Sequence, residues 1–210
     1  MTRIKFCGFT REEDVAHALE LKVDAIGVVR ERTSKRYLKD QGVLDIVRLC
    51  GPLFQVVSVY GKGPGPLKTW RPLGTNLVQA ARPVYYFDGR PPQIRSLRLT
   101  TEVGTGDEIF ELGSKAIKDE SCVGLLLDAH DDNADGGTGK KVDWTAAAEF
   151  VQLCNLPVIL AGGLTPDNVG EAIRTVRPYA VDVSSGIEVS PGIKDPAKMK
   201  AFVEAVRATG

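Results

Sequence analysis

The chain alternates short apolar, β-rich runs with stretches of helical periodicity, and this alternation continues from end to end. Strands that alternate with helices favour parallel βαβ units, because each parallel pairing needs a crossover connection. About eight such units in a chain of this size predict a (β/α)₈ barrel that forms one domain over residues 1–210. A doubly wound open sheet is the alternative, but no G-x-G-x-x-G motif follows the first expected strand.

The elements can be placed approximately from their patterns. A T-x-x-E capping box at Thr10 and Glu13 predicts the start of the first helix, and Thr165 with Pro166 predicts the start of a later one. Pro and Gly are dense between Gly61 and Ser96, so we expect an irregular third-to-fourth unit. The expected strands are 3–6, 25–29, 54–59, 76–79, 97–101, 123–128, 157–161 and 180–184, and a helix is expected near 109–116.

Composition limits the classes of function. The chain has 27 basic and 27 acidic residues, which are spread along it, so nothing indicates a nucleic-acid or membrane partner. No apolar run is long enough to span a bilayer, and the N-terminus does not resemble a secretory signal. The four cysteines form no C-x-x-C pair, so a zinc site is not expected. We therefore expect a cytoplasmic protein that needs no metal.

Candidate site residues cluster where the expected strands end, because barrel enzymes carry their active sites there. Gly162–Gly163 and Ser184–Ser185–Gly186 are turns of small residues in two successive units. Such turns let backbone N–H groups approach an anion, so the pair predicts a phosphate site formed by residues 162–163 and 184–186. Either turn alone could also be a tight turn without a ligand.

Three reactive side chains lie near the same expected edge. Asp128 ends an apolar strand and suits a general acid; the alternative is an N-cap or a structural hydrogen-bond acceptor. Cys7 follows the first strand and precedes a helix start, which favours its thiolate, yet it could be a small buried residue. Arg36 could bind a carboxylate or be a solvated charge. His17 is expected to be structural and His130 is weak evidence, while "GGTGKK" does not have the spacing of a P-loop.

Seven segments together resemble the phosphoribosylanthranilate isomerase family, the (β/α)₈ enzymes of tryptophan biosynthesis. They are "KFCGFTREED", "DAIGVV" with "SKRY", "LLLDA", "GGTGKKVDW", "LAGGLTPDNV" and "VDVSSGIEVSPGIKD". The resemblance implies an Amadori rearrangement of N-(5-phosphoribosyl)anthranilate without a metal or cofactor. It implies that Asp128 is the general acid, that Cys7 is the general base and that Arg36 binds the anthranilate carboxylate. The residues 162–163 and 184–186 match the family's phosphate site, and Asp182 also matches a family position.

Two departures from the family pattern stand out. The family commonly has "QLHG" at the end of the fourth strand, whereas Gln79 is followed here by "AAR". "SKR" replaces the frequent "SPR" and leaves Arg36 in place. Another phosphate-binding barrel enzyme and a non-catalytic ligand-binding descendant are the alternatives. The sequence does not indicate the oligomeric state.

Overall fold

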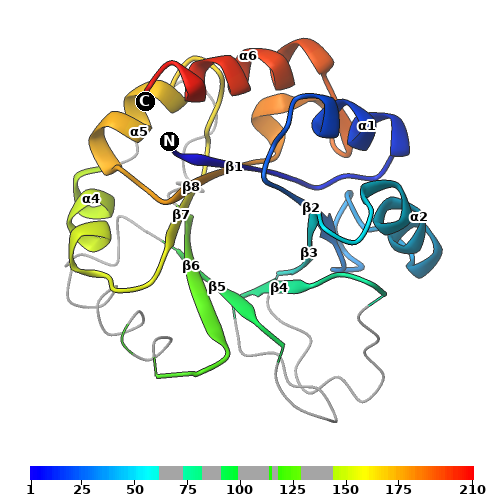
Figure 1. Cartoon of the computed structure of the whole chain (residues 1–210), viewed down its shortest axis with the longest axis horizontal. Coiled ribbons are helices and arrows are strands. Elements are labelled where there is room, and N and C mark those ends of the chain that lie inside the picture. The colour runs from blue at the N-terminus through cyan, green and yellow to red at the C-terminus, as the bar shows by residue number, and fades with distance from the viewer. Residues whose placement is uncertain (62–72, 82–90, 99–113, 115–117, 129–143) are drawn as a thin grey trace.

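The computed structural model describes residues 1–61, 73–81, 91–98, 114, 118–128 and 144–210. Eight parallel strands close into a barrel in sequence order, with β8 pairing back onto β1. Figure 1 shows these strands as a ring, with the described helices arranged around its outside. The strands are β1 (Arg3–Cys7), β2 (Ala25–Val29), β3 (Gln55–Tyr60), β4 (Leu77–Ala80), β5 (Gln93–Arg98), β6 (Cys122–Asp128), β7 (Val158–Ala161) and β8 (Ala180–Val183). The predicted (β/α)₈ architecture is confirmed.

Among the described residues, helices follow β1, β2, β6, β7 and β8. The helices are α1 (Glu12–Glu20), α2 (Asp40–Cys50), α4 (Trp144–Leu153), α5 (Val169–Val176) and α6 (Pro196–Arg207). Within the described ranges, none of them is long and apolar enough to cross a membrane. A short excursion follows β8 and comprises a 3₁₀ turn η1 (Ser185–Ile187) and an antiparallel pair, β9 (Glu188–Ser190) and β10 (Ile193–Lys194).

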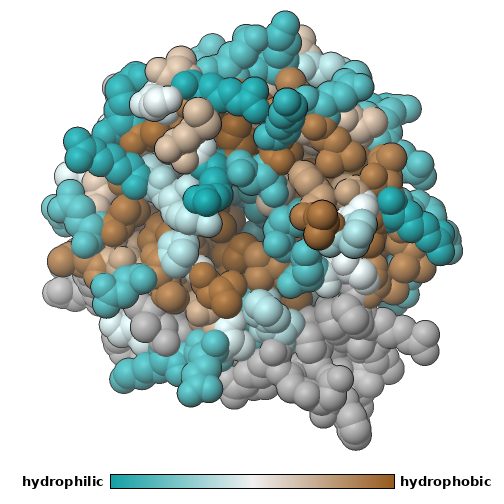
Figure 2. Space-filling view, in the orientation of Figure 1, coloured by the Kyte–Doolittle hydropathy of each residue, from teal (hydrophilic) through white to brown (hydrophobic). Residues whose placement is uncertain are grey.

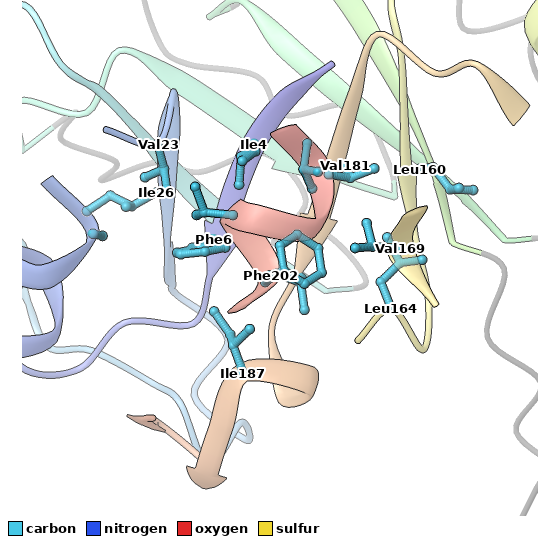
Figure 3. Close-up of a cluster of buried hydrophobic side chains, with 14 of the residues drawn as sticks. Ile4, Phe6, Val23, Ile26, Leu160, Leu164, Val169, Val181, Ile187 and Phe202 are labelled. Carbon is cyan, nitrogen blue, oxygen red and sulfur yellow. The ribbon is translucent and has the colours of Figure 1, made fainter. Parts of the chain in front are cut away.

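The largest cluster of buried apolar side chains lies between the strands and the surrounding helices. Phe6 of β1 meets Phe202 of α6 edge to face, with ring centroids 5.8 Å apart, and Ile187 of η1 lies close by (Figure 3). Burial of each such side chain stabilises the fold by about 2 kcal/mol. Because Ile187 is completely buried, this cluster also anchors the turn that follows β8. By contrast, hydrophilic side chains cover much of the outer margin of the face in Figure 2.

Both predicted helix starts are wrong. The first helix begins at Glu12 with Arg11 in the N-cap position, and Thr10 instead donates its hydroxyl to the carbonyl oxygen of Gly192 at 2.5 Å. Helix α5 begins at Val169 with Asn168 in the N-cap position, so Thr165 and Pro166 lie outside it. At α1, Thr10 is engaged in a long-range contact that local patterns do not reveal. At α5, by contrast, the side chain of Asn168 forms hydrogen bonds with the nearby residues Thr165 and Gly163.

The fifth strand also differs from its prediction. It starts at Gln93 rather than at position 97, and Gln93 is completely buried with its side chain bonded to Ser121. Gln93 and Arg95 are polar, so the segment lacks the apolar pattern from which the other strands were predicted. In the structure, Arg95 lies near Asp119 and donates a hydrogen bond to the carbonyl oxygen of Ala81. Much of the segment expected to be irregular and most of the helix expected near 109–116 lie outside the described residues.

Candidate functional site

A pocket of about 230 Å³ opens at the carboxyl ends of the barrel strands. It brings together six of the residues proposed from the sequence, which are Cys7, Asp128, Gly162, Gly163, Ser184 and Ser185. The rest of its lining is Gln79, Leu126, Ala161, Leu164, Asp182 and Val183. These residues come from β1, β4, β6, β7 and β8 and from the turns that follow β7 and β8, so the closed barrel itself gathers them.

The turn after β7 has a conformation that glycine adopts readily. Gly162 and Gly163 have φ angles of 95° and 61°, in the left-handed region where a side chain is strained. Asn168 holds this turn closed, because its side-chain oxygen accepts from the Thr165 N–H at 2.8 Å and its NH₂ group donates to the Gly163 carbonyl at 3.0 Å. The sequence analysis missed Asn168, although an Asn shortly before a helix is a known turn-forming signal.

The turn after β8 packs directly against the turn after β7. Ser184 precedes η1, and the first N–H groups of a helical turn have no partners within that turn. Gly186 does not line the pocket; a Cβ at this position would lie 1.9 Å from the carbonyl oxygen of Leu164. Gly186 therefore determines how closely the two turns approach each other, which differs from its expected place in direct contact with a ligand.

Cys7 lines this pocket with charged groups beside it. It is 8% exposed, and the ammonium group of Lys5 lies 2.9 Å from an Asp182 carboxylate oxygen in the same buried region. Burial raises the pKa of the Cys7 thiol, Lys5 and Lys194 act in the opposite direction, and Asp182 adds to the rise. Burial would lower the pKa of Lys5, but Asp182 and Cys7 raise it above its ordinary value. The expectation of a favoured thiolate is wrong, because burial outweighs the nearby cations.

Arg36 lies next to this pocket rather than in its lining. Its Cδ and the Oγ of Ser184 both flank Gly8, the residue after Cys7. Its guanidinium forms a bidentate ion pair with Glu188, with Nε 2.9 Å from Oε1 and Nη2 2.5 Å from Oε2. The hydrogen bonds to Glu188 keep the pKa of Arg36 above its ordinary value. The alternative of a solvated surface charge is therefore wrong.

Gln79 is a pocket residue to which the sequence assigned no role of its own. It is 7% exposed, and its Oε1 has no hydrogen-bond partner among the described residues. Asp128 is half-buried in the same lining. His17 is exposed on α1 beside Glu20, away from the pocket, whereas His130 and the "GGTGKK" segment lie outside the described residues. Over the described ranges, His, Cys, Asp and Glu form no group of three or more that could hold a metal ion.

Comparison with known proteins identifies the family. A model of N-(5′-phosphoribosyl)anthranilate isomerase matches residues 93–205. A curated enzyme of that name from Pseudomonas aeruginosa is 38% identical over 211 residues, which span 98% of this chain and 95% of the relative. The chain belongs to the N-(5′-phosphoribosyl)anthranilate isomerase family.

Solved structures agree with this membership. Phosphoribosyl anthranilate isomerase from Thermotoga maritima is 28% identical, with a TM-score of 0.74 over 99% of this chain and all of that one. A second isomerase structure, solved in complex with reduced 1-(o-carboxyphenylamino)-1-deoxyribulose 5-phosphate, is 26% identical with a TM-score of 0.73. It covers 99% of this chain and 100% of that one. The family resemblance noted in the sequence is confirmed. The predicted function, an isomerase of tryptophan biosynthesis, is confirmed as well.

The isomerase barrel has a second, larger cavity of about 370 Å³ at its opposite end. Residues at the amino ends of the strands line it, among them Arg3, Ala25, Gln55 and Ala180. In (β/α)₈ enzymes this end contributes to stability, while the chemistry is carried by the carboxyl ends. The smaller pocket is therefore the candidate active site.

Proposed function

We propose that this chain rearranges N-(5′-phosphoribosyl)anthranilate with Asp128 as general acid and Cys7 as general base. The observation that carries the assignment is that both side chains line one pocket together with the turns after β7 and β8. A substrate that spans these turns and the pocket needs a phosphate at one end and a reacting sugar beside it. The ligand of the solved relative, a deoxyribulose 5-phosphate, has this form.

The phosphate end is held by backbone groups in this proposal. The N–H groups of Gly163, Ser184 and Ser185 lie in two turns that Asn168 and Gly186 keep in place. Oriented backbone N–H groups bind phosphate without a bulky side chain in the way. The phosphate would thereby place the ribose between Cys7 and Asp128.

The acid acts first. Asp128 donates its proton to the ring oxygen of the ribose, the bond between C1′ and that oxygen breaks, and the anilino nitrogen supplies the electron pair for a C=N bond. Cys7 then removes the proton from C2′, and the electrons of the C–H bond form a C1′=C2′ bond while the nitrogen becomes neutral. The resulting enolamine gains a proton at C1′ and loses the one on the C2′ hydroxyl, which gives the ketone.

Lys5 and Gln79 support these steps. The Lys5 ammonium opposes the effect of burial on the Cys7 thiol, so it stabilises the thiolate that takes the C2′ proton. The side-chain oxygen of Gln79 is a buried acceptor at the pocket wall, and a hydroxyl of the sugar would satisfy it. A cytoplasmic location stays a prediction from the composition.

The loss of substrate fluorescence tests the proposal. Purified protein is mixed with N-(5′-phosphoribosyl)anthranilate, and the decay is compared between the natural chain and Asp128→Asn. Rapid decay that the substitution abolishes supports both the reaction and the acid. If the folded natural chain leaves the fluorescence unchanged, the proposed function is wrong. If the fluorescence decays as fast with Asp128→Asn as with the natural chain, the assignment of Asp128 as the general acid is wrong.

A further inference from the structure

Two buried charged side chains and one partly buried one lie in a row beside the candidate active site. Glu188 begins β9 and Lys194 ends β10, so the short antiparallel pair places them side by side. Their side chains are 4% and 0% exposed, and Arg36, at 24%, completes the row. Burying a lysine is costly, and burial lowers the pKa of Lys194 even though Glu188 acts against that effect. A buried ion pair is weak evidence of stabilisation, so the position of these charges needs another explanation.

Lys194 connects the ends of two strands that carry site residues. Its ammonium group donates to the carbonyl oxygen of Cys7 and lies 3.4 Å from that of Ser184. It also lies 2.9 Å from Oε1 of Glu188 and 5.3 Å from the centre of the Phe9 ring. One cation therefore contacts the residue proposed as base, one phosphate turn and the carboxylate that holds Arg36.

Glu188 determines which part of Arg36 remains available. The carboxylate occupies Nε and Nη2 on one edge of the guanidinium, and it also accepts from the Gly192 N–H at 3.2 Å. A guanidinium has five N–H donors in a planar fork. Among the described residues no other side chain accepts from the guanidinium of Arg36, so its Nη1 side is left for a ligand.

The charge balance explains the presence of Lys194. Arg36 and Glu188 alone would form a neutral pair, which offers an incoming carboxylate little net attraction. With Lys194 the group carries one net positive charge. Charge-assisted bidentate binding of a carboxylate is strong where the guanidinium is fixed and its charge is not already neutralised.

We propose that Lys194 is a positioning residue, which neutralises Glu188 so that the fixed guanidinium of Arg36 keeps its positive charge for the substrate's aromatic carboxylate. This inference rests on the proposed function and adds a determinant of substrate specificity to it. Lys194 acts through Glu188 and Arg36 and does not itself touch the substrate.

A pair of ligands isolates the contribution of the carboxylate. Reduced 1-(o-carboxyphenylamino)-1-deoxyribulose 5-phosphate is compared with the same molecule lacking the carboxylate, and both affinities are measured by calorimetry. We expect the natural chain to prefer the carboxylated ligand. In Lys194→Met that preference falls by about tenfold, while the affinity for the other ligand changes by less than about twofold.

Two further variants make the test sharper. Lys194→Gln keeps polar contacts to the Cys7 and Ser184 carbonyl oxygens without the charge, so it should lose the preference even if Lys194→Met does not fold. Lys198→Met is the matched control, because Lys198 donates to the backbone oxygen of Glu188 at 2.9 Å and not to its carboxylate. This control should leave the preference unchanged.

Two outcomes would overturn the inference. Equal weakening of both ligands in the Lys194 variants would mean that Lys194 only supports the structure. An unchanged preference for the carboxylated ligand would mean that the charge of Lys194 does not affect binding of the carboxylate. Substrate turnover by the natural chain separates these outcomes from a failure of the proposed function, since that turnover does not depend on the ligand comparison.

Discussion

Gly186 packs so closely against Leu164 that the two turns of the candidate phosphate site form one unit. A Cβ on Gly186 would lie 1.9 Å from the Leu164 carbonyl oxygen, a distance that non-bonded atoms do not reach. The turn after β8 therefore cannot accept a side chain here unless one backbone moves away from the other.

Gly186→Ala should consequently impair both stability and ligand binding. We expect a loss of about 3 kcal/mol in the free energy of unfolding, at the upper end of overpacking substitutions. The KM for substrate should rise because the turns separate. Gly170→Ala in α5 is the control: its Cβ would lie no closer than 3.4 Å to its nearest neighbour, Arg174, and the helix should gain up to about 1 kcal/mol. Denaturant unfolding and steady-state kinetics check both variants, and unaltered kinetics in Gly186→Ala would contradict this account.

Cys7→Ser and Asp128→Asn should each lose most activity while remaining folded. Both side chains line the pocket, and removal of a general acid or base lowers a rate by about 10²–10⁴-fold. Far-UV circular dichroism establishes that the variants are folded, and turnover of N-(5′-phosphoribosyl)anthranilate gives the rate. A near-normal rate in either variant would show that its residue is not a proton carrier.

The pH at which Cys7 reacts should depend on Lys5. Burial and Asp182 raise the pKa of this thiol, while the cations Lys5 and Lys194 lower it. We expect half-maximal alkylation by iodoacetamide above the ordinary thiol range, and at a still higher pH in Lys5→Met, which lacks one of the lowering charges. Mass spectrometry of the peptide that contains Cys7 follows the reaction. Lys200→Met, an exposed change on α6, should leave the profile in place.

The sequence could predict those parts of the site that local rules control. Strand periodicity located the ends of β1 and β6, and the rule that barrel chemistry lies at these ends then selected Cys7 and Asp128. Gly162 and Gly163 were recognisable because a run of glycines after a strand indicates an unusual turn. Such signals lie within a few residues of the position that they predict.

Long-range pairs could not be predicted in this way. Arg36 and Glu188 are separated by 152 positions, and Lys194 by 187 from the Cys7 carbonyl that it contacts. Thr10 resembled an N-cap, but its hydroxyl bonds to Gly192, which is 182 positions away. No local periodicity reports such contacts, because the closure of the barrel creates them.

Glu188→Gln should change how stability depends on pH. Burial alone would raise the pKa of Glu188, but hydrogen bonds and charges from Arg36 and Lys194 lower it below its ordinary value. A carboxyl group with a lowered pKa in the folded state stabilises the protein above its ordinary pKa, and this is lost as the pH falls through the folded-state value. The free energy of unfolding of the natural chain should therefore exceed that of the variant by about 3 kcal/mol at pH 7. This difference should become smaller below about pH 4.5.

Denaturant unfolding at several pH values measures that gap. Glu204→Gln is the control, since Glu204 is exposed and lies 3.8 Å from Lys200 in an ordinary surface pair. The free energies of unfolding of the natural chain and Glu204→Gln should agree within about 0.5 kcal/mol at every pH. A gap for Glu188→Gln that is constant with pH would mean that the carboxylate charge does not contribute to stability.

Two buried glutamines should respond in opposite ways to replacement by leucine. The Oε1 of Gln79 has no partner among the described residues and borders the pocket, so Gln79→Leu should change stability little. It should lower kcat/KM by about tenfold, the value of one hydrogen bond to a sugar hydroxyl.

Gln93 is completely buried and donates to Ser121 at 3.2 Å, away from the pocket lining. Gln93→Leu should therefore lower the melting temperature and leave kcat/KM of the folded protein unchanged. Thermal melts and kinetics on both variants test this contrast, and a loss of stability without a kinetic effect in Gln79→Leu would assign that residue a structural role.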